Sequence, residues 1–422
     1  MRSWPAPDVP QLPGTGGVVH LFDTATESLL ATRTDGPAHL YVCGITPYDA
    51  THLGHANTYL AYDLLVRAWR DAGREVRYVQ NVTDIDDPLL ERACATGTDW
   101  ERIAADQIDL FRSDMETLRV LPPTTYVGVV ESVGPIAAAV EHMLDQGSAY
   151  RVALPEGAGG AAPDLGDVYA DVSADPLFGT AARLETGEME RLFAENGGDP
   201  DREGKRQPLD PLLWRRSRDG EPDWDGGGLG HGRPGWHLEC ACFAHAYLDG
   251  DVEVQGGGRD LVFPHHEMSE SHLRMLTDTA TPVLVHNHAG LVAYDGEKMS
   301  KSRGNLVFVS RLVADGTDAM AVRLLLLAHH YRTDWEYRDT DVTAATQRLE
   351  RWRQAVCLPS GPAAEPVLDR VRQALADDLD APAALAAVDA WVDAASADQG
   401  SGVDGAPELV RRTVDALLGV AL

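Results

Sequence analysis

Lysine is rare in this chain, and two of the three lysines stand close together. Lys205, Lys298 and Lys301 are the only lysines in 422 residues, whereas Lys and Arg together number 36. Arginine supplies every other basic side chain, so a retained lysine indicates a need for a compact, rotatable point charge. Two such charges in EKMSKS (residues 297–302) could neutralise charge that develops on a pyrophosphate leaving group. A solvated basic loop is the alternative, but the scarcity of lysine favours a catalytic role for Lys298 and Lys301.

A second candidate site is the run His52-Leu53-Gly54-His55, which stands between a predicted strand and a predicted helix. Free N–H groups and the dipole at a helix N-terminus favour a phosphate, and glycine lets a ligand approach the backbone closely. Alone, such a run also fits an ordinary loop. Its position directly after a strand favours the phosphate site, so we predict that His52 and His55 are catalytic.

The elements around this run predict a parallel sheet. Residues 39–43 read as a strand, residues 55–72 have apolar side chains at helical spacing, and residues 75–82 alternate as a second strand. A strand, a helix and a strand in succession are typical of a βαβ unit, whose two strands are parallel. The fold class is therefore α/β.

The remaining chain divides by composition. Residues from about 150 to 230 are rich in Gly and Pro and are expected to form an insertion carried on loops, with one short strand in GDVYADV. Regular α/β texture returns around residue 237, and from 341 the pattern is helical to the end. The predicted parts are the first half of a catalytic domain (1–147), a connective insertion (148–232), the second half (233–335) and a C-terminal helical bundle (341–422).

Composition limits the partners and the compartment. The chain has 66 Asp and Glu residues and a net charge of −30, which disfavours nucleic-acid binding. Residues 341–422 contain seven arginines and thirteen acidic residues, so the bundle is a poor RNA-binding module. Five scattered cysteines form no disulfide framework, and neither a membrane span nor a secretory leader is apparent. We expect a cytoplasmic monomer that binds neither nucleic acid nor membrane.

Together, the two motifs resemble those of the class I aminoacyl-tRNA synthetases. Residues 52–55 are similar to the HIGH motif of these enzymes, and residues 298–302 match their KMSKS motif letter for letter. The resemblance implies a Rossmann-type catalytic domain that binds ATP, with Mg²⁺ expected beside it, and activates a carboxylate as its adenylate.

Neighbouring residues resemble the cysteine-specific branch of these synthetases. The resembling segments are Cys43-Gly44, GWHLEC at 235–240 and GRDLVFPHHE at 258–267. In cysteinyl-tRNA synthetases the corresponding cysteines, histidine and a glutamate hold zinc. The resemblance therefore implies one Zn²⁺ per chain on Cys43, Cys240 and His265, a donor set that suits zinc and leaves a fourth position for water or substrate.

The zinc glutamate of the synthetases corresponds to Ser269 here, so serine or water would complete the shell. A substrate thiolate on zinc would separate cysteine from serine. His266 and Glu267 either orient the ligand histidine or are polar groups beside it. Further contacts to substrate and ATP are implied for Cys43, Gly44, Ile45, Thr46, Thr58, Asn81, Val82, Thr83, Trp236, Gly258, Arg259, Asp260 and Val292.

The chain also departs from the synthetases. It lacks the arginine that closes their first motif and has no basic anticodon-binding module. These departures resemble the actinobacterial cysteine:glucosaminyl-inositol ligases of mycothiol biosynthesis, as do CGITPYDATH (43–52), QNVTDIDD (80–87) and ENGGDP (195–200). The implied substrates are L-cysteine, ATP and glucosaminyl-inositol, whose amine needs a base such as Asp84 or Asp86. A cysteinyl-tRNA synthetase and a non-catalytic zinc- or cysteine-binding relative are the alternatives.

Overall fold

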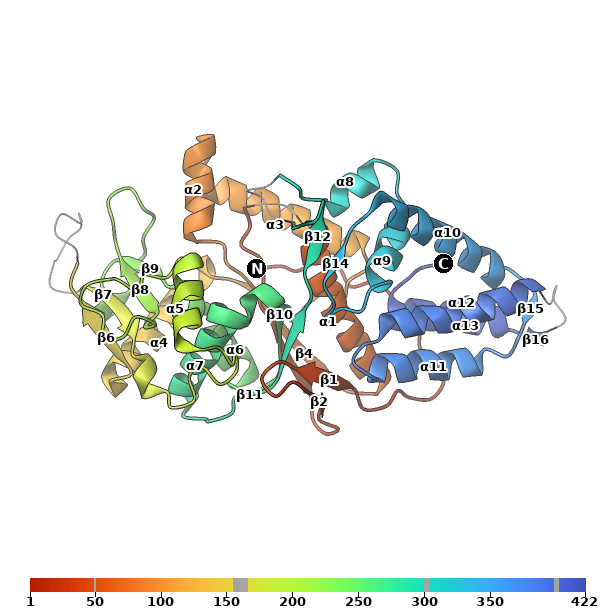
Figure 1. Cartoon of the computed structure of the whole chain (residues 1–422), viewed down its shortest axis with the longest axis horizontal. Helices are drawn as coiled ribbons and strands as arrows, with labels where there is room; N and C mark the ends of the chain where they lie inside the picture. The colour runs from red at the N-terminus through yellow and green to blue at the C-terminus, as the bar shows by residue number, and fades with distance from the viewer. Residues whose placement is uncertain (49–50, 155–165, 300–303, 398–401) are drawn as a thin grey trace.

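Five parallel strands form the central sheet of the computed structural model, in the order β11-β10-β3-β4-β5 (Figure 1). Every neighbouring pair is parallel, and β3 is buried along its whole length, as expected for a sheet that helices cover on both faces. This sheet confirms the predicted Rossmann-type fold. The strands are β3 (Ala38–Val42), β4 (Val76–Val82), β5 (Thr125–Gly128), β10 (Val252–Gly258) and β11 (Val283–Ala289). The structure describes residues 1–48, 51–154, 166–299, 304–397 and 402–422.

Helix α1 (Leu53–Asp71) connects β3 to β4, as the apolar spacing predicted. The imidazole of His52 caps its N-terminus by accepting a hydrogen bond from the backbone N–H of Gly54. The chain leaves the helix at Gly73, whose φ of +82° is a conformation that glycine adopts without strain. The helix N-terminus is thereby placed at the carboxyl end of β3.

Several elements around the sheet were not predicted. An antiparallel hairpin near the N-terminus and helix α2 are among them, because four-residue strands and a ten-residue helix give weak periodic signals. The unpredicted elements are β1 (His20–Asp23), β2 (Ser28–Ala31) and α2 (Asp87–Thr96). The sequence does predict helices at residues 99–119 and 131–146, and α3 (Trp100–Thr117) and α4 (Val133–Gln146) confirm them. Short 3-10 turns cover Val130–Ser132, Val172–Ala174 and Gly227–Leu229.

The expected loop-borne insertion instead contains a four-stranded antiparallel sheet in the order β6-β7-β8-β9 and one helix. Its strands are only three to five residues long, and Gly/Pro-rich runs between them mask their pattern. Lys205 is not a freely solvated lysine: its side chain is 2% exposed and pairs with Asp199 at 3.0 Å. The elements are β6 (Ala149–Val152), β7 (Asp167–Ala170), α5 (Thr186–Glu195), β8 (Leu212–Arg216) and β9 (Gly232–Pro234).

The second half of the catalytic domain returns to the central sheet through α6 (Trp236–Leu248) and α7 (Glu267–Thr277). A small sheet in the order β13-β12-β14 leads into the residues of the KMSKS motif. Its strands and the helices that follow are β12 (Val292–Tyr294), β13 (Glu297–Lys298), β14 (Trp335–Glu336), α8 (Val309–Ala314) and α9 (Ala319–Leu327).

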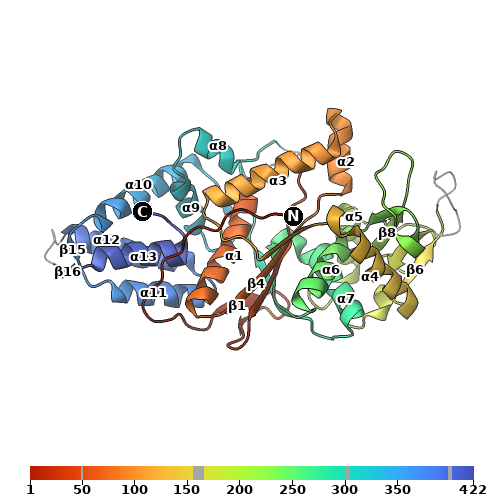
Figure 2. The same ribbon diagram turned by 180° about the vertical axis from the view of Figure 1, so that it is seen from behind.

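A C-terminal helical bundle lies on the side of the central sheet opposite the insertion, as both views show (Figures 1 and 2). Buried Arg67 on α1 pairs with Asp63 at 2.8 Å and donates to the carbonyls of Asp415 and Ala416 at 3.1 Å. The bundle is thus fixed to the helix that begins at the HLGH run. Its elements are α10 (Asp339–Val356), β15 (Ser360–Gly361), α11 (Glu365–Ala376), α12 (Ala381–Ala397), β16 (Val403–Asp404) and α13 (Ala406–Leu418). In the described part of the chain, no helix has the length and apolar character that crossing a bilayer requires.

Candidate active site

The candidate site is a pocket of about 340 Å³ at the carboxyl ends of β3 and β10. These neighbouring strands flank the point where the strand order reverses, which is where open α/β sheets bind ligands. Most residues predicted from the sequence meet there. Those that line the pocket are Cys43, Gly44, Ile45, Thr46, His52, His55, Thr58, Trp236, Gly258, Asp260 and Val292.

Asn81 holds the pocket wall from behind. Its Oδ1 accepts a hydrogen bond from the backbone N–H of Gly44 at 2.9 Å and from the hydroxyl of Tyr41 at 3.1 Å. A Cβ atom on Gly44 would lie 1.5 Å from the carbonyl oxygen of Asn81, so only glycine permits this approach of the two segments. A direct contact of Asn81 with substrate stays a prediction.

Three other predicted residues also lie outside the pocket lining. Val82 is fully buried in the core, and the hydroxyl of Thr83 donates to Glu239 at 3.0 Å. Arg259 pairs with Asp334 at 2.9 Å. Their predicted contacts with substrate or ATP are therefore not part of the pocket geometry and remain predictions.

His52 and His55 lie together at the N-terminus of α1. Their rings are stacked with centroids 3.9 Å apart, and both line the pocket. The backbone N–H groups of Leu53 and Gly54 are already bonded, to the carbonyl of Val307 at 2.9 Å and to Nδ1 of His52 at 3.1 Å, so a phosphate site at this helix start stays a prediction. The structure thus brings the HLGH run to the candidate active site.

The KMSKS motif is described only in part. The backbone of Lys298 forms the end of β13, and the buried side chain of Met299 lines the pocket. The side chain of Lys298 and all of Lys301 lie outside the described residues. Met299 nevertheless places this motif beside the HLGH run.

Cys43, Cys240 and His265 meet as a buried cluster whose potential ligand atoms all lie within 4.8 Å of one another. The Sγ atom of Cys240 lies 3.3 Å from Sγ of Cys43 and 3.1 Å from Nε2 of His265. The three residues come from the end of β3, from α6 and from a π turn at Val262–His266. The arrangement implied by the family resemblance is therefore present in the geometry.

The two thiols of this cluster differ in acidity. Burial raises the pKa of the Cys43 thiol. Burial acts in the same direction at Cys240, but hydrogen bonds from Cys43 and His265 outweigh it and hold the pKa of Cys240 well below its ordinary value. A buried thiolate between a thiol and an imidazole is a donor set that suits a soft or borderline metal cation.

Aromatic groups surround the cluster. Trp236 stacks on His265 with ring centroids 4.3 Å apart and also lines the pocket, so it is a pocket wall rather than core. Nε2 of His266 lies 3.1 Å from Sγ of Cys43, which favours its predicted role beside the ligands. Ser269, in the position of the synthetase glutamate, is buried. The nearby Cys242 packs in the core and does not join the cluster.

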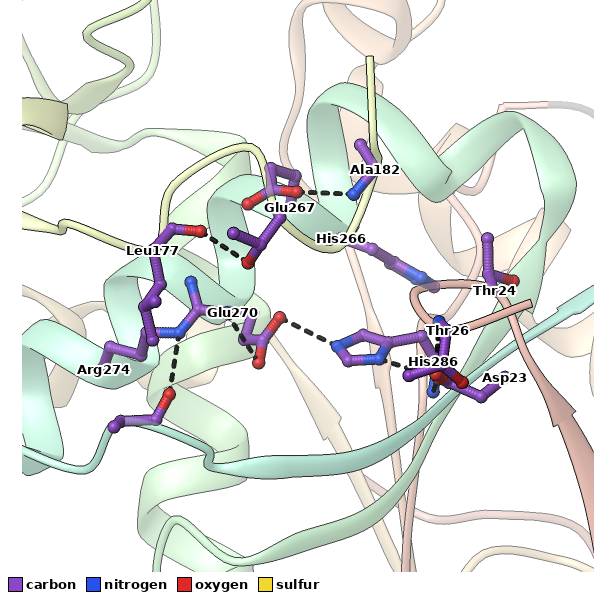
Figure 3. A network of polar contacts seen from close by, with 12 residues as sticks. Asp23, Thr24, Thr26, Leu177, Ala182, His266, Glu267, Glu270, Arg274 and His286 are labelled. Carbon is purple, nitrogen blue, oxygen red and sulfur yellow. Dashed lines mark hydrogen bonds and ion pairs between the residues drawn. The ribbon is translucent and has the colours of Figure 1, made fainter. Parts of the chain in front are cut away.

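Glu267 serves a different purpose from His266. Its carboxylate accepts hydrogen bonds from the backbone N–H groups of Gly179 and Ala182, both at 2.7 Å, and Figure 3 draws the bond from Ala182. It therefore fixes a loop of the insertion to the start of α7, next to His265 of the cluster. The residues around Glu267 in the sequence could not predict this contact, because the partner segment lies more than 80 residues away.

A buried ionic network holds α7 from the other side. The imidazole of His286 lies between Asp23 of the N-terminal hairpin at 3.0 Å and Glu270 of α7 at 2.8 Å (Figure 3). Arg274 extends it, bonding Glu270 and Asp175 at 2.9 Å each. Burial opposes the charge on His286, but the two carboxylates raise its pKa to about 9. Helix α7, which follows His265, is thus tied to the hairpin and the insertion.

Among the pocket residues missed in the sequence are two tyrosines. Tyr48 lines the pocket, and Tyr59 lines it while donating its hydroxyl to the carbonyl of Cys43 at 3.1 Å. Tyr59 lies one helical turn after His55, so helix periodicity could have found it. Tyr48 lies in an irregular loop, where no periodicity applies.

Comparison with known proteins agrees with this geometry. Residues 30–347 match the family model of the tRNA synthetases class I (C) catalytic domain. Proteins named L-cysteine:1D-myo-inositol 2-amino-2-deoxy-alpha-D-glucopyranoside ligase are 59% identical over 425 residues in Sanguibacter keddieii, 60% over 422 in Cellulomonas flavigena and 54% over 423 in Streptomyces coelicolor. Each of these alignments covers 100% of both chains.

Solved structures share the fold at low identity. Mycobacterium tuberculosis methionyl-tRNA synthetase in complex with methionyl-adenylate superposes with a TM-score of 0.61 at 17% identity, over 91% of this chain and 92% of that one. The leucyl enzyme agnB2 LeuRS of Agrobacterium radiobacter K84 gives 0.62 at 13%, over 92% and 84%. The chain therefore belongs to the class I (C) tRNA synthetase catalytic-domain family and, within it, to the group of L-cysteine:1D-myo-inositol 2-amino-2-deoxy-alpha-D-glucopyranoside ligases.

Proposed function

We propose that this chain is an ATP-dependent ligase that activates L-cysteine as cysteinyl adenylate. It then joins the cysteine by an amide to the amine of glucosaminyl-inositol and releases AMP and pyrophosphate. The observation that carries this proposal is the Cys43–Cys240–His265 cluster at the pocket that the HLGH run also lines. Full-length relatives at 54–60% identity bear the name of this ligase.

Cysteine selection is assigned to the cluster. The two thiols and one imidazole fit zinc, which would supply a Lewis-acidic position for the substrate thiolate. Trp236, stacked on His265, closes one side of the pocket and limits the size of the amino acid. Serine has no soft ligand to offer at that position, so the site rejects it.

Adenylation is assigned to the two motifs. The N-terminus of α1 with His52 and His55 holds the phosphates while the cysteine carboxylate attacks the α-phosphorus of ATP. The bond from that phosphorus to the pyrophosphate oxygen breaks, and Lys298 and Lys301 neutralise the leaving group. Mg²⁺ is expected on the phosphates of ATP.

Amide formation needs a base, because the aminosugar attacks only as the free amine. Asp86 is one candidate. It caps α2, and burial raises its pKa to about 6, so at neutral pH its carboxylate is mostly ionised and can accept a proton. Asp84 is the other; burial raises its pKa as well, and it already accepts a hydrogen bond from the backbone of Val130. Asp86 has the fewer fixed partners, so we favour it.

The cysteinyl-tRNA synthetase alternative would require a polyanion to approach a chain of net charge −30. The bundle at 341–422 is acidic and offers no basic excess to offset that repulsion. We therefore propose that this enzyme acts on the small aminosugar and binds no nucleic acid. A cytoplasmic monomer remains our expectation for its state in the cell.

The direct test is product analysis. Purified enzyme with ATP, Mg²⁺, L-cysteine and glucosaminyl-inositol should yield the cysteinyl amide and one AMP per amide, measured by mass spectrometry and chromatography. Omitting the aminosugar should leave only cysteine-dependent exchange of pyrophosphate into ATP. Exchange without any amide would refute the proposed acceptor while retaining the adenylation step.

A further inference from the structure

A second cavity, also of about 340 Å³, opens beside the candidate active site. It lies between α2, α3 and the segment just before α8. Of the described residues, none to which we assign adenylation lines it. Tyr48 lines both cavities. Phe308 lines the second and pairs its backbone with that of His52 in an antiparallel bridge. The two cavities thus share one wall and flank the HLGH run.

The polar lining of this second cavity favours a ligand rich in hydrogen-bond donors. Asp106 offers a carboxylate, Gln107 an amide, and Thr96 and Thr98 offer hydroxyls. Gln107 lines the cavity, although its Oε1 atom is itself buried.

Charge disfavours a phosphate in this cavity. Arg92 is its one cationic side chain, and Asp106 contributes one negative charge, so the lining has no positive excess. A triphosphate or an RNA backbone would need such an excess. A neutral polyol meets no such penalty.

Apolar faces complete the lining. The rings of Tyr48 and Phe308 and the side chain of Ile103 offer flat apolar surface next to the polar groups. Pockets that bind small molecules combine apolar walls with a few placed polar groups in this way. A cyclic polyol presents both C–H faces and hydroxyl edges, and therefore complements both kinds of surface.

We propose that this cavity is the subsite for the inositol ring of the acceptor. This inference rests on the proposed function, in which the glucosamine amine attacks the adenylate in the first pocket. The rest of the acceptor must then extend out of that pocket, and the second cavity, which shares Tyr48 with it, is adjoining space. Asp106 and Thr98 accept hydrogen bonds from the inositol hydroxyls, and the amide nitrogen of Gln107 donates one.

Two acceptor substrates distinguish an effect on the inositol subsite from an effect on the reacting amine. Glucosaminyl-inositol carries the inositol ring, whereas glucosamine has the same amine without it. The test variants are Gln107→Ala and Asp106→Asn. Their matched controls are Gln354→Ala on the exposed face of α10 and Asp109→Asn, an exposed aspartate on α3.

We expect Gln107→Ala and Asp106→Asn to raise the KM for glucosaminyl-inositol about three- to tenfold, the scale of one or two lost hydrogen bonds. The kcat/KM for glucosamine and the rate of cysteine-dependent pyrophosphate exchange should stay within about twofold of wild type. The control variants should match wild type in all three measurements.

The contrary outcomes are distinct. An unchanged KM for glucosaminyl-inositol, or an equal loss with glucosamine, would overturn the subsite while leaving the ligase function standing. Slower pyrophosphate exchange in Gln107→Ala would overturn it too, since the cavity would then serve ATP or cysteine. Failure of the wild-type enzyme to form any amide would instead contradict the proposed function itself.

Discussion

The Sγ atoms of Cys43 and Cys240 lie 3.3 Å apart, although 197 residues separate the two cysteines in the chain. Their proximity follows from the sheet order, since β3 and β10 are parallel neighbours and α6 precedes β10 directly. His265 joins them on the π turn that follows β10. The cluster thus depends on the crossover that joins the two halves of the fold.

Metal binding should depend on this cluster. We predict about one Zn²⁺ per chain by elemental analysis, and its loss in Cys240→Ala together with cysteine adenylation, because two ligands cannot hold the ion tightly. Cys94→Ala is the matched control, since Cys94 is exposed and distant from the cluster. Stoichiometric zinc in purified Cys240→Ala would refute the ligand assignment.

Serine should be a very poor substrate. Pyrophosphate exchange supported by serine should be slower than that with cysteine by roughly 10⁴-fold or more, the scale on which a site rejects an analogue that lacks its specific ligand group. The measurement is kcat/KM for each amino acid with enzyme at full zinc occupancy. Discrimination below a hundredfold would argue against direct coordination of the substrate thiolate.

Lys301→Ala should slow adenylate formation by about 10²- to 10³-fold, as expected for loss of one charge that stabilises the leaving group. Lys301→Arg should recover only part of the rate, because a planar guanidinium differs in geometry from an ammonium. Rapid-quench kinetics measure the step, and cysteine binding should be unchanged. A wild-type rate in Lys301→Ala would remove the motif from the mechanism.

His286→Gln should destabilise the fold at neutral pH. The pKa of His286 is raised to about 9, so its stabilising charge is fully present below pH 6.5 and is lost as pH rises through 9. The variant should lose on the order of 3 kcal/mol at pH 7 and much less at pH 10, in denaturant titrations.

The exposed His142→Gln serves as the matched control for His286→Gln and should change stability little at either pH. An equal loss of stability at pH 7 and pH 10 would show that packing, not charge, gives His286 its effect.

Part of the fold was predictable from local patterns. The β3–α1–β4 unit was found because buried strands and an amphipathic helix have strong periodic signals. The strands of the insertion were not predicted because they are short and separated by Gly/Pro-rich runs. The burial of Lys205 could not be predicted either, because it depends on tertiary contacts and not on the local sequence pattern.

The candidate site was predictable to a different degree. The HLGH and KMSKS motifs are each contiguous in the sequence. Residue types and spacing alone therefore predicted phosphate binding and neutralisation of a pyrophosphate leaving group at these motifs. The Cys43–Cys240–His265 cluster joins residues from distant segments, and only family resemblance could bring them together before the fold was known. The second cavity, beside α3, has neither a contiguous motif nor a family resemblance to predict it, because its polar groups come from two helices and two loops.

A competition between acceptors tests the central claim most directly. Labelled cysteine, ATP and enzyme are mixed with glucosaminyl-inositol and bacterial tRNA for cysteine together at physiological salt, and label is measured in each product. The account predicts cysteinyl amide of the aminosugar with matching AMP, and no label in tRNA. Label in tRNA without aminosugar product would contradict it.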